Sequence, residues 1–125
     1  HVCPVHSLQL VAKDDIDYRY KQADRRVLDE AFALRDTADD VLIVRHGLLT
    51  DTSIANIALW NGCEWHTPAQ PLLAGTQRRY LLDTGQIKET DIPVASLGNY
   101  RHIRLFNALI PFGEVELPVG QIRMY

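Results

Sequence analysis

The sequence has little cysteine, no long apolar run and no strong excess of charge. It contains 2 cysteines, and its 13 Lys and Arg against 16 Asp and Glu give a formal net charge of −3. No apolar run approaches the roughly 20 residues of a membrane span, and no signal-peptide pattern opens the chain. The scattered basic residues give only a weak signal for nucleic-acid binding. We therefore expect a cytoplasmic protein with neither a membrane nor a nucleic acid as partner.

Few residues are placed to bind a metal ion. Cys3 and His6, and again Cys63 and His66, have the spacing Cys-x-x-His, and two such pairs would suit tetrahedral zinc. The pairs are far apart in the sequence and lack a compact ligand spacing, so we expect no metal site. We also expect both cysteines to be reduced thiols, because nothing else in the sequence points to secretion.

The apolar content of the chain is that of one ordinary globular domain. Its 125 residues are 46% hydrophobic and 23% charged, so we expect a single domain over residues 1–125. The periodicity of the apolar residues predicts a mixed α/β (α+β) fold. Strands are expected at residues 6–12, 16–21, 41–44, 54–60, 63–67 and 103–110, with a last edge strand or tail over 115–120, and helices at 24–34 and 76–82.

The stretch from Gly47 to Trp60 places one carboxylate, Asp51, among small polar residues between two apolar flanks. A buried acid needs hydrogen-bond donors or a positive charge, because desolvation otherwise favours its neutral form. The stretch alone leaves the identity of that partner open.

Two further residues have both a structural and a functional interpretation. Lys21 ends the alternating run 16–21, and its face is either solvated or the wall of a site; solvent is favoured because lysines are mostly exposed. Gly75 precedes the helix expected at 76–82, where unpaired N–H groups stabilise an anion such as phosphate. The alternative for Gly75 is a simple turn before a surface helix.

Four segments stand in a definite order: a strand ending in Lys21, Thr50–Asp51 with Asn56, Gly75–Arg78, and Asn107–Leu109. In order and spacing they resemble the C-terminal portion of the class IV pyridoxal-phosphate-dependent enzymes, over about residues 18–111. That family includes branched-chain and D-amino-acid aminotransferases and aminodeoxychorismate lyase. The resemblance implies pyridoxal 5′-phosphate as cofactor, the C-terminal domain of the D-amino-acid-aminotransferase-like fold (a mixed sheet or pseudo-barrel with flanking helices), and a homodimer.

The resemblance also assigns roles near the reacting end of the cofactor. Lys21 matches the lysine that forms a Schiff base with the cofactor aldehyde and then moves protons, which a lysine can do when desolvation frees its amine. Asp51 matches the acid that bonds the pyridine nitrogen and keeps the ring an effective electron sink. The family usually has Glu there, and Asp51 keeps the charge that this chemistry needs. Leu73 matches the apolar residue that packs on the ring face.

The phosphate end is matched by the segment Gly75–Arg78, which resembles the family's Gly-Ile-Thr-Arg. In that motif successive backbone amides and a Thr hydroxyl hold the phosphate. Thr76 and Gln77 keep the amides, while Gln77 stands in the place of the hydroxyl. Asn107 with Ala108 resembles the lyase more than the aminotransferases, and Ala108 can offer the phosphate only its backbone N–H.

The leading hypothesis is therefore a lyase that converts 4-amino-4-deoxychorismate to 4-aminobenzoate and pyruvate, a step of folate biosynthesis. The alternatives are a class IV aminotransferase acting on branched-chain or D-amino acids, and a non-catalytic binding domain. In this family an N-terminal domain supplies a phosphate-binding Arg and much of the substrate pocket. The segment before Lys21 is too short to match it, so we expect that domain to be absent from this chain.

Overall fold

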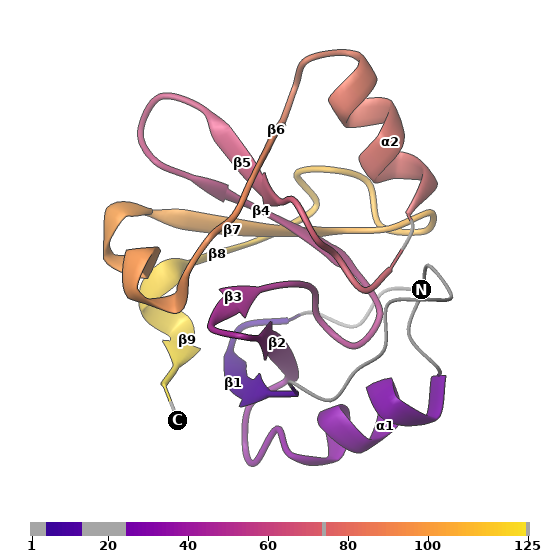
Figure 1. Cartoon of the computed structure of the whole chain (residues 1–125), viewed down its shortest axis with the longest axis vertical. Coiled ribbons are helices and arrows are strands. Elements are labelled where there is room, and N and C mark those ends of the chain that lie inside the picture. Colours follow the sequence, from indigo (N-terminus) through magenta and orange to yellow (C-terminus); the bar gives the residue numbers. More distant parts are fainter. Residues whose placement is uncertain (1–4, 14–24, 74, 125) are drawn as a thin grey trace.

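The computed structural model describes residues 5–13, 25–73 and 75–124 (Figure 1). Within these ranges the chain forms two β-sheets, two α-helices and two short 3₁₀ helices. The helices are α1 (Arg25–Ala33), α2 (Thr76–Asp83), η1 (Val94–Asn99) and η2 (Val119–Gln121). The strands are β1 (Leu8–Ala12), β2 (Asp40–Arg45), β3 (Leu48–Leu49), β4 (Asn56–Trp60), β5 (Trp65–Pro68), β6 (Lys88–Thr90), β7 (His102–Phe106), β8 (Val115–Pro118) and β9 (Ile122–Arg123).

The strands form two mixed sheets. The first has the order β3-β2-β1-β9, and the second has the order β6-β5-β4-β7-β8. In the first sheet β1 is parallel to both β2 and β9, while β3 returns antiparallel to β2. In the second sheet β5, β4, β7 and β8 are antiparallel neighbours, and β6 joins β5 in parallel. The predicted mixed α/β fold is confirmed.

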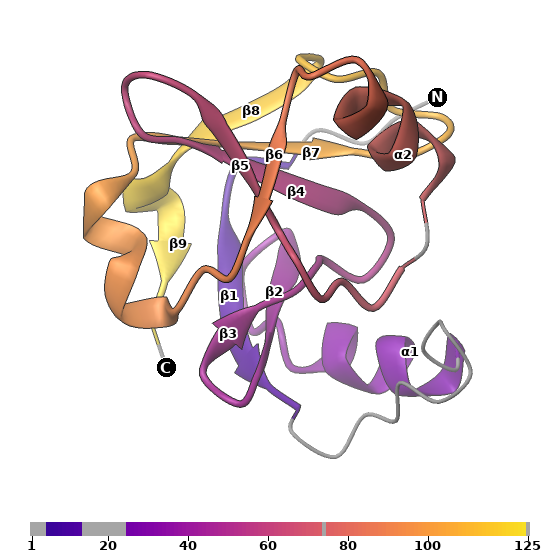
Figure 2. The same ribbon diagram turned by 45° about the horizontal axis from the view of Figure 1, so that its top comes forward.

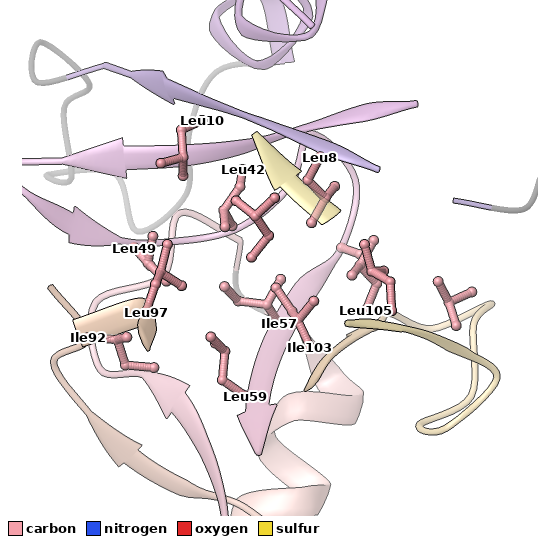
Figure 3. Close-up of a cluster of buried hydrophobic side chains, with 14 of the residues drawn as sticks. Leu8, Leu10, Leu42, Leu49, Ile57, Leu59, Ile92, Leu97, Ile103 and Leu105 are labelled. Carbon is pink, nitrogen blue, oxygen red and sulfur yellow. The ribbon is translucent and has the colours of Figure 1, made fainter. Parts of the chain in front are cut away.

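The two sheets face each other across one apolar core (Figure 3). Because side chains alternate between the faces of a strand, Leu8, Leu10 and Leu42 of the first sheet point toward the second. There they meet Ile57 and Ile103, and all five side chains are at most 2% exposed. Full burial of a side chain of this size contributes roughly 1.5–3 kcal/mol, so this core holds the sheets together.

The helices cover the outer faces of the sheets (Figure 2). Leu28 of α1 packs with Val41 and Ile43 of β2, and Leu81 of α2 packs with Phe106 of β7. Strand β2 is thus covered on both faces, which explains its continuous apolar run. The mixed sheets with flanking helices agree with the fold that the family resemblance implied.

The strand predicted over residues 103–110 is wrong beyond Phe106. The side-chain oxygen of Asn107 accepts the backbone N–H groups of Leu109 and Ile110, each at 2.8 Å. An Asn side chain that bonds the backbone two or three residues later imposes a turn. This local hydrogen bonding ends β7, although the apolar residues continue.

Two short strands have no apolar pattern that could predict them. Strand β6 is the polar segment Lys88–Thr90, whose extended form depends on its pairing with β5. Strand β9 pairs with the start of β1, with Leu8 opposite Ile122 and Gln9 opposite Arg123. The edge strand expected after residue 115 is confirmed as β8.

Turns at Gly47 and Gly62 connect neighbouring strands. His46 and Gly47 have φ angles of 53° and 78° and connect β2 to the antiparallel β3. Gly62 has a φ of 102° in the connection between β4 and β5. Glycine adopts these positive φ values without the steric cost that a Cβ brings.

Three sequence predictions fall outside the described residues. They are the strand at 16–21, the candidate lysine Lys21 at its end, and the metal or thiol role of Cys3. In the part of the chain that the structure does describe, every helix is too short or too polar to cross a membrane.

Candidate functional site

Asp51 follows β3 and has an exposed fraction of only 1%. Its Oδ1 accepts a hydrogen bond from the side-chain amide of Asn56 at 3.0 Å. Its Oδ2 accepts the backbone N–H groups of Leu72 and Leu73, the latter at 2.8 Å. The buried carboxylate therefore has three donors from within the chain.

Hydroxyl groups hold the backbone on either side of Asp51. The Thr50 hydroxyl donates to the carbonyl of Ile43 at 2.8 Å, and the Thr52 hydroxyl accepts the N–H of Ala55 at 3.0 Å. Both threonines are buried, so these bonds satisfy groups that water cannot reach. The small polar residues of this stretch thus fix the backbone that carries the carboxylate.

Burial raises the pKa of Asp51 from 3.8 to about 6. Desolvation of the charged form is the largest cause of the rise. The hydrogen bonds from Asn56, Leu73 and Leu72 oppose it, as does the positive charge of Arg78. A carboxyl group with a pKa of about 6 is mostly ionised at neutral pH, so Asp51 carries a buried negative charge.

Asn56, the first residue of β4, connects three segments of the chain. Its Nδ2 donates to Asp51 and to the carbonyl of Leu73, each at 3.0 Å. Its Oδ1 lies against Gly75, where a Cβ would overlap with it. A single side chain that is 2% exposed therefore joins three of the residues that the sequence assigns to the cofactor.

Helix α2 begins at Thr76, and Gly75 is its N-cap residue without a side-chain cap from the described residues. The first N–H groups of a helix have no partner within it, and the helix dipole places partial positive charge there. Beside this end lies a hollow of about 440 Å³, lined by Thr76, Gln77, Tyr80, Ala108 and Pro111. An anion in this hollow would lie beside the first turn of α2, whose N–H groups have no partner within the helix.

The turn between β7 and β8 forms the opposite wall of the hollow, and both views show it beside α2 (Figures 1 and 2). The Gln77 side-chain NH₂ donates to the carbonyls of Asn107 and Ile110, the second at 2.9 Å. The Gln77 side-chain oxygen accepts the N–H of Phe112 at 2.7 Å. Asn107 in turn donates to the carbonyl of Ile54 at 3.0 Å. The turn is thus hydrogen-bonded both to α2, through Gln77, and to the segment before β4, through Ile54.

The candidate residues within the described ranges form two adjoining groups. The first group meets at Asn56, and the second surrounds the hollow. Their members are Asp51, Leu73 and Gly75 in the first, and Thr76, Gln77, Asn107 and Ala108 in the second. Gly75 and Thr76 are consecutive and join the groups, although Asp51 is not part of the wall of the hollow. Lys21 lies outside the described residues.

Sequence reasoning missed the wall residues Tyr80 and Pro111, and it gave Asn56 no role of its own. The helical repeat could have identified Tyr80, because it lies four positions after Thr76 and therefore on the same face of α2. The hydrogen bonds of Asn56 could not have been identified this way, because they join residues from separate segments.

A second polar cluster lies around β5. The ring nitrogens of His66 lie 2.8 Å from the Tyr100 hydroxyl and 2.8 Å from a Glu64 oxygen, and Lys88 approaches Glu64 at 3.4 Å. Cys63 beside them is exposed. Among the residues that the structure describes, no group of three or more His, Cys, Asp or Glu could hold a metal ion.

A sequence model of the family described as amino-transferase class IV matches residues 6–117. A Schizosaccharomyces pombe protein named "Putative aminodeoxychorismate lyase" is 35% identical over 98 residues, and the match covers 70% of this chain and 42% of that protein. The chain spans about half of the length of the curated relatives it matches.

Solved structures resemble the chain over most of its length. A "putative 4-amino-4-deoxychorismate lyase" from Haemophilus somnus 129pt superimposes with a TM-score of 0.79 and 34% identity, covering 88% of this chain and 57% of that chain. An aminotransferase from Brucella abortus, bound to its cofactor pyridoxal phosphate, gives a TM-score of 0.71 at 15% identity, covering 97% and 48%. The second likeness shows a shared fold.

Proposed function

Because the chain belongs to the class IV aminotransferase family, we propose that it is part of a pyridoxal-phosphate-dependent lyase that converts 4-amino-4-deoxychorismate to 4-aminobenzoate and pyruvate. The observation that carries this proposal is the hollow walled by Thr76, Gln77 and Ala108, next to the group that contains the buried Asp51. The segment Asn107–Leu109 and the names of the S. pombe and H. somnus relatives favour the lyase.

The walls of the hollow fit a phosphate group. The N–H groups of Thr76 and Gln77 belong to the uncapped first turn of α2, where an anion is stabilised. Thr76 is exposed and could add its hydroxyl, and Ala108 on the opposite wall is exposed as well. These residues would hold the phosphate of the cofactor.

Asp51 fits the partner of the pyridine nitrogen in its charge and its burial. Its three internal donors leave one of the roughly four acceptor sites of a carboxylate. Pyridoxal phosphate, when bound, supplies an electron sink for the substrate. Asp51 would hold a proton at the ring nitrogen, and Leu73, whose backbone bonds both Asp51 and Asn56, would pack on the ring face.

Lys21 is proposed as the residue that attaches covalently to the cofactor and moves a proton of the substrate. A lysine amine acts as nucleophile and then as base once it is desolvated. Loss of the ring proton to Lys21 would accompany cleavage of the C–O bond between the ring and the enolpyruvyl group, so that the ring becomes aromatic, and the released enolpyruvate becomes pyruvate by taking up a proton. We assign the proton transfer to Lys21 and the charge that supports it to Asp51.

An aminotransferase acting on branched-chain or D-amino acids is the second candidate, favoured by the fold shared with the B. abortus aminotransferase. The products distinguish the two activities. The lyase releases pyruvate from 4-amino-4-deoxychorismate without an acceptor, whereas the aminotransferase needs a 2-oxo acid. We also propose that the protein acts as a cytoplasmic homodimer in folate biosynthesis.

The test is covalent labelling of the full-length protein. The protein is incubated with pyridoxal phosphate, reduced with borohydride and digested, and mass spectrometry locates the modified lysine. We expect modification of Lys21 that Lys21→Ala removes and Lys88→Ala leaves in place, because Lys88 is exposed and pairs with Glu64. An unmodified protein, or a label on another lysine, contradicts the proposal.

A further inference from the structure

We infer that Gln77 is a positioning residue, whose side chain fixes the turn at residues 107–112 so that the backbone of Ala108 faces the hollow beside the start of α2. The inference rests on the proposed function for the identity of the ligand. It concerns the side chain of Gln77, whereas the cofactor contact proposed above concerns its backbone N–H.

All the hydrogen-bonding groups of the Gln77 amide are directed to the same turn. Its NH₂ group donates to the carbonyls of Asn107 and Ile110, and its oxygen accepts the N–H of Phe112. These partners are 30 to 35 positions later in the sequence, so the bonds join two separate segments. Ala108 lies between the bonded positions Asn107 and Ile110 and, like Pro111, is an exposed residue of the turn that lines the hollow.

The far end of the turn is anchored by aromatic packing. The ring of Phe112 meets Trp65 and Phe106 edge to face, with centroid distances of 5.5 Å and 5.3 Å. Tilted aromatic pairs of this kind contribute beyond their area burial. Gln77 therefore connects the first turn of α2 to a segment whose end cannot move freely.

A threonine at this position could not make the same connection. A hydroxyl group donates one hydrogen bond, whereas the Gln amide donates two and accepts others. The Gln77 side chain is occupied by the turn and has no donor left for a phosphate. This chain therefore relies on backbone N–H groups and on Thr76 for the phosphate, and on Gln77 to keep the two walls at a fixed separation.

The experiment uses the full-length protein and the variants Gln77→Met and Gln77→Glu. Methionine keeps the length of the side chain without the hydrogen bonds, and glutamate keeps the acceptor for Phe112 without the donors. Hydrogen exchange of the amides in residues 107–112 is measured without cofactor, and dissociation constants are measured for pyridoxal phosphate and for inorganic phosphate. The melting temperature is recorded for each variant.

We expect faster exchange at Ile110 and Phe112 in Gln77→Met, and a dissociation constant for pyridoxal phosphate raised about tenfold. Gln77→Glu should preserve the exchange protection of Phe112 better than Gln77→Met does. The matched control is Gln86→Met, because Gln86 is exposed just after α2 and, among the described residues, its side chain bonds only Thr84. That control should leave the exchange and both dissociation constants unchanged.

Unchanged exchange in Gln77→Met overturns the inference. Faster exchange and a lower melting temperature with unchanged dissociation constants also overturn it, because the side chain would then only stabilise the fold. The parent protein could bind inorganic phosphate but not pyridoxal phosphate, with Gln77→Met lowering the affinity for inorganic phosphate. In that case the positioning role stands and the proposed function fails. If the parent binds neither ligand, both fail.

Discussion

The side-chain oxygen of Asn56 fills the space in which Gly75 would otherwise carry a Cβ. A Cβ built there would overlap with this oxygen and would lie 3.2 Å from Asn56 Cγ and 3.7 Å from Cβ of Arg78. Asn56 is buried, and its amide nitrogen is bonded to Asp51 and Leu73. A rotation of this side chain away from Gly75 would break those two hydrogen bonds. The start of α2 thus requires glycine for packing within the chain, before any ligand is considered.

Replacing Gly75 with alanine should destabilise the protein by about 1–3 kcal/mol, the usual cost of inserting a methyl group into a packed region. Urea denaturation without cofactor measures this free energy of unfolding. The control is Gly98→Ala, because a Cβ on Gly98 meets no atom within 4 Å and its φ is not in the positive range. That change should stay within about 0.5 kcal/mol. Equal effects of the two substitutions would show that the collision with Asn56 is absent.

The collision predicts an energetic coupling between Asn56 and Gly75. Asn56→Ala removes the donor to Asp51 and to the Leu73 carbonyl, and should cost about 1–3 kcal/mol by itself. It also empties the space beside Gly75, so Gly75→Ala should cost at least about 1 kcal/mol less in that background. The four unfolding free energies of a double-mutant cycle measure the coupling. If the effects of the two substitutions on the free energy of unfolding simply added, direct contact between Asn56 and residue 75 would be contradicted.

The raised pKa of Asp51 predicts a loss of stability as the pH rises. The folded protein holds the proton up to about pH 6, whereas the unfolded chain releases it near 3.8. Between these values the folded state binds more protons, so the free energy of unfolding falls with increasing pH, by about 3 kcal/mol over the whole window. The loss is complete above about pH 6, the opposite of the usual behaviour of a paired carboxylate.

Comparison with Asp51→Asn isolates this contribution. Burial also raises the pKa of Asp40, which is present in both proteins and therefore cancels in the difference. Urea unfolding at a series of pH values from 4 to 7 should give a flatter dependence for Asp51→Asn than for the parent. If the free energy of unfolding had the same pH dependence in both proteins, Asp51 would not be the source of that dependence.

The same substitution tests the proposed catalytic role. Asn keeps much of the shape of Asp51 and lacks its charge, so the ring nitrogen would lose the partner that favours its protonated form. We expect turnover of 4-amino-4-deoxychorismate by the full-length protein to fall at least about a hundredfold, with the covalent label on Lys21 retained. Turnover equal to that of the parent would exclude this role.

Periodicity predicted those elements whose side chains face a core. Strand β2 is apolar throughout because it is covered on both faces, and α1 carries its apolar stripe toward that same strand. The segment at 103–110 misled the same reasoning, because the hydrogen bonds of Asn107 bend a run of apolar residues into a turn. Strand β6 has no pattern, since its conformation comes from β5 beside it.

The sequence offered candidate residues for the site, but it could not indicate the hydrogen bonds that connect them. The resemblance identified Asp51 and the segment at Gly75, and the structure brings them together. The donors of Asp51 include the N–H groups of Leu72 and Leu73, which lie 21 and 22 positions later. Backbone groups carry no residue-specific signal, so a sequence cannot indicate which of them will reach a distant carboxylate.

Strand β9 has a consequence for how the chain acquires its fold. Gln9 of β1 lies beside Arg123 of β9, 114 positions later, so β9 can pair with this edge of β1 only after residues 122 and 123 have been synthesised. Contacts of such long separation form slowly, and an unpaired strand edge can pair with other chains in the meantime. During synthesis, therefore, the strands of the second sheet are all available before the first sheet is complete, and this edge of β1 stays open to pairing with other chains until β9 follows.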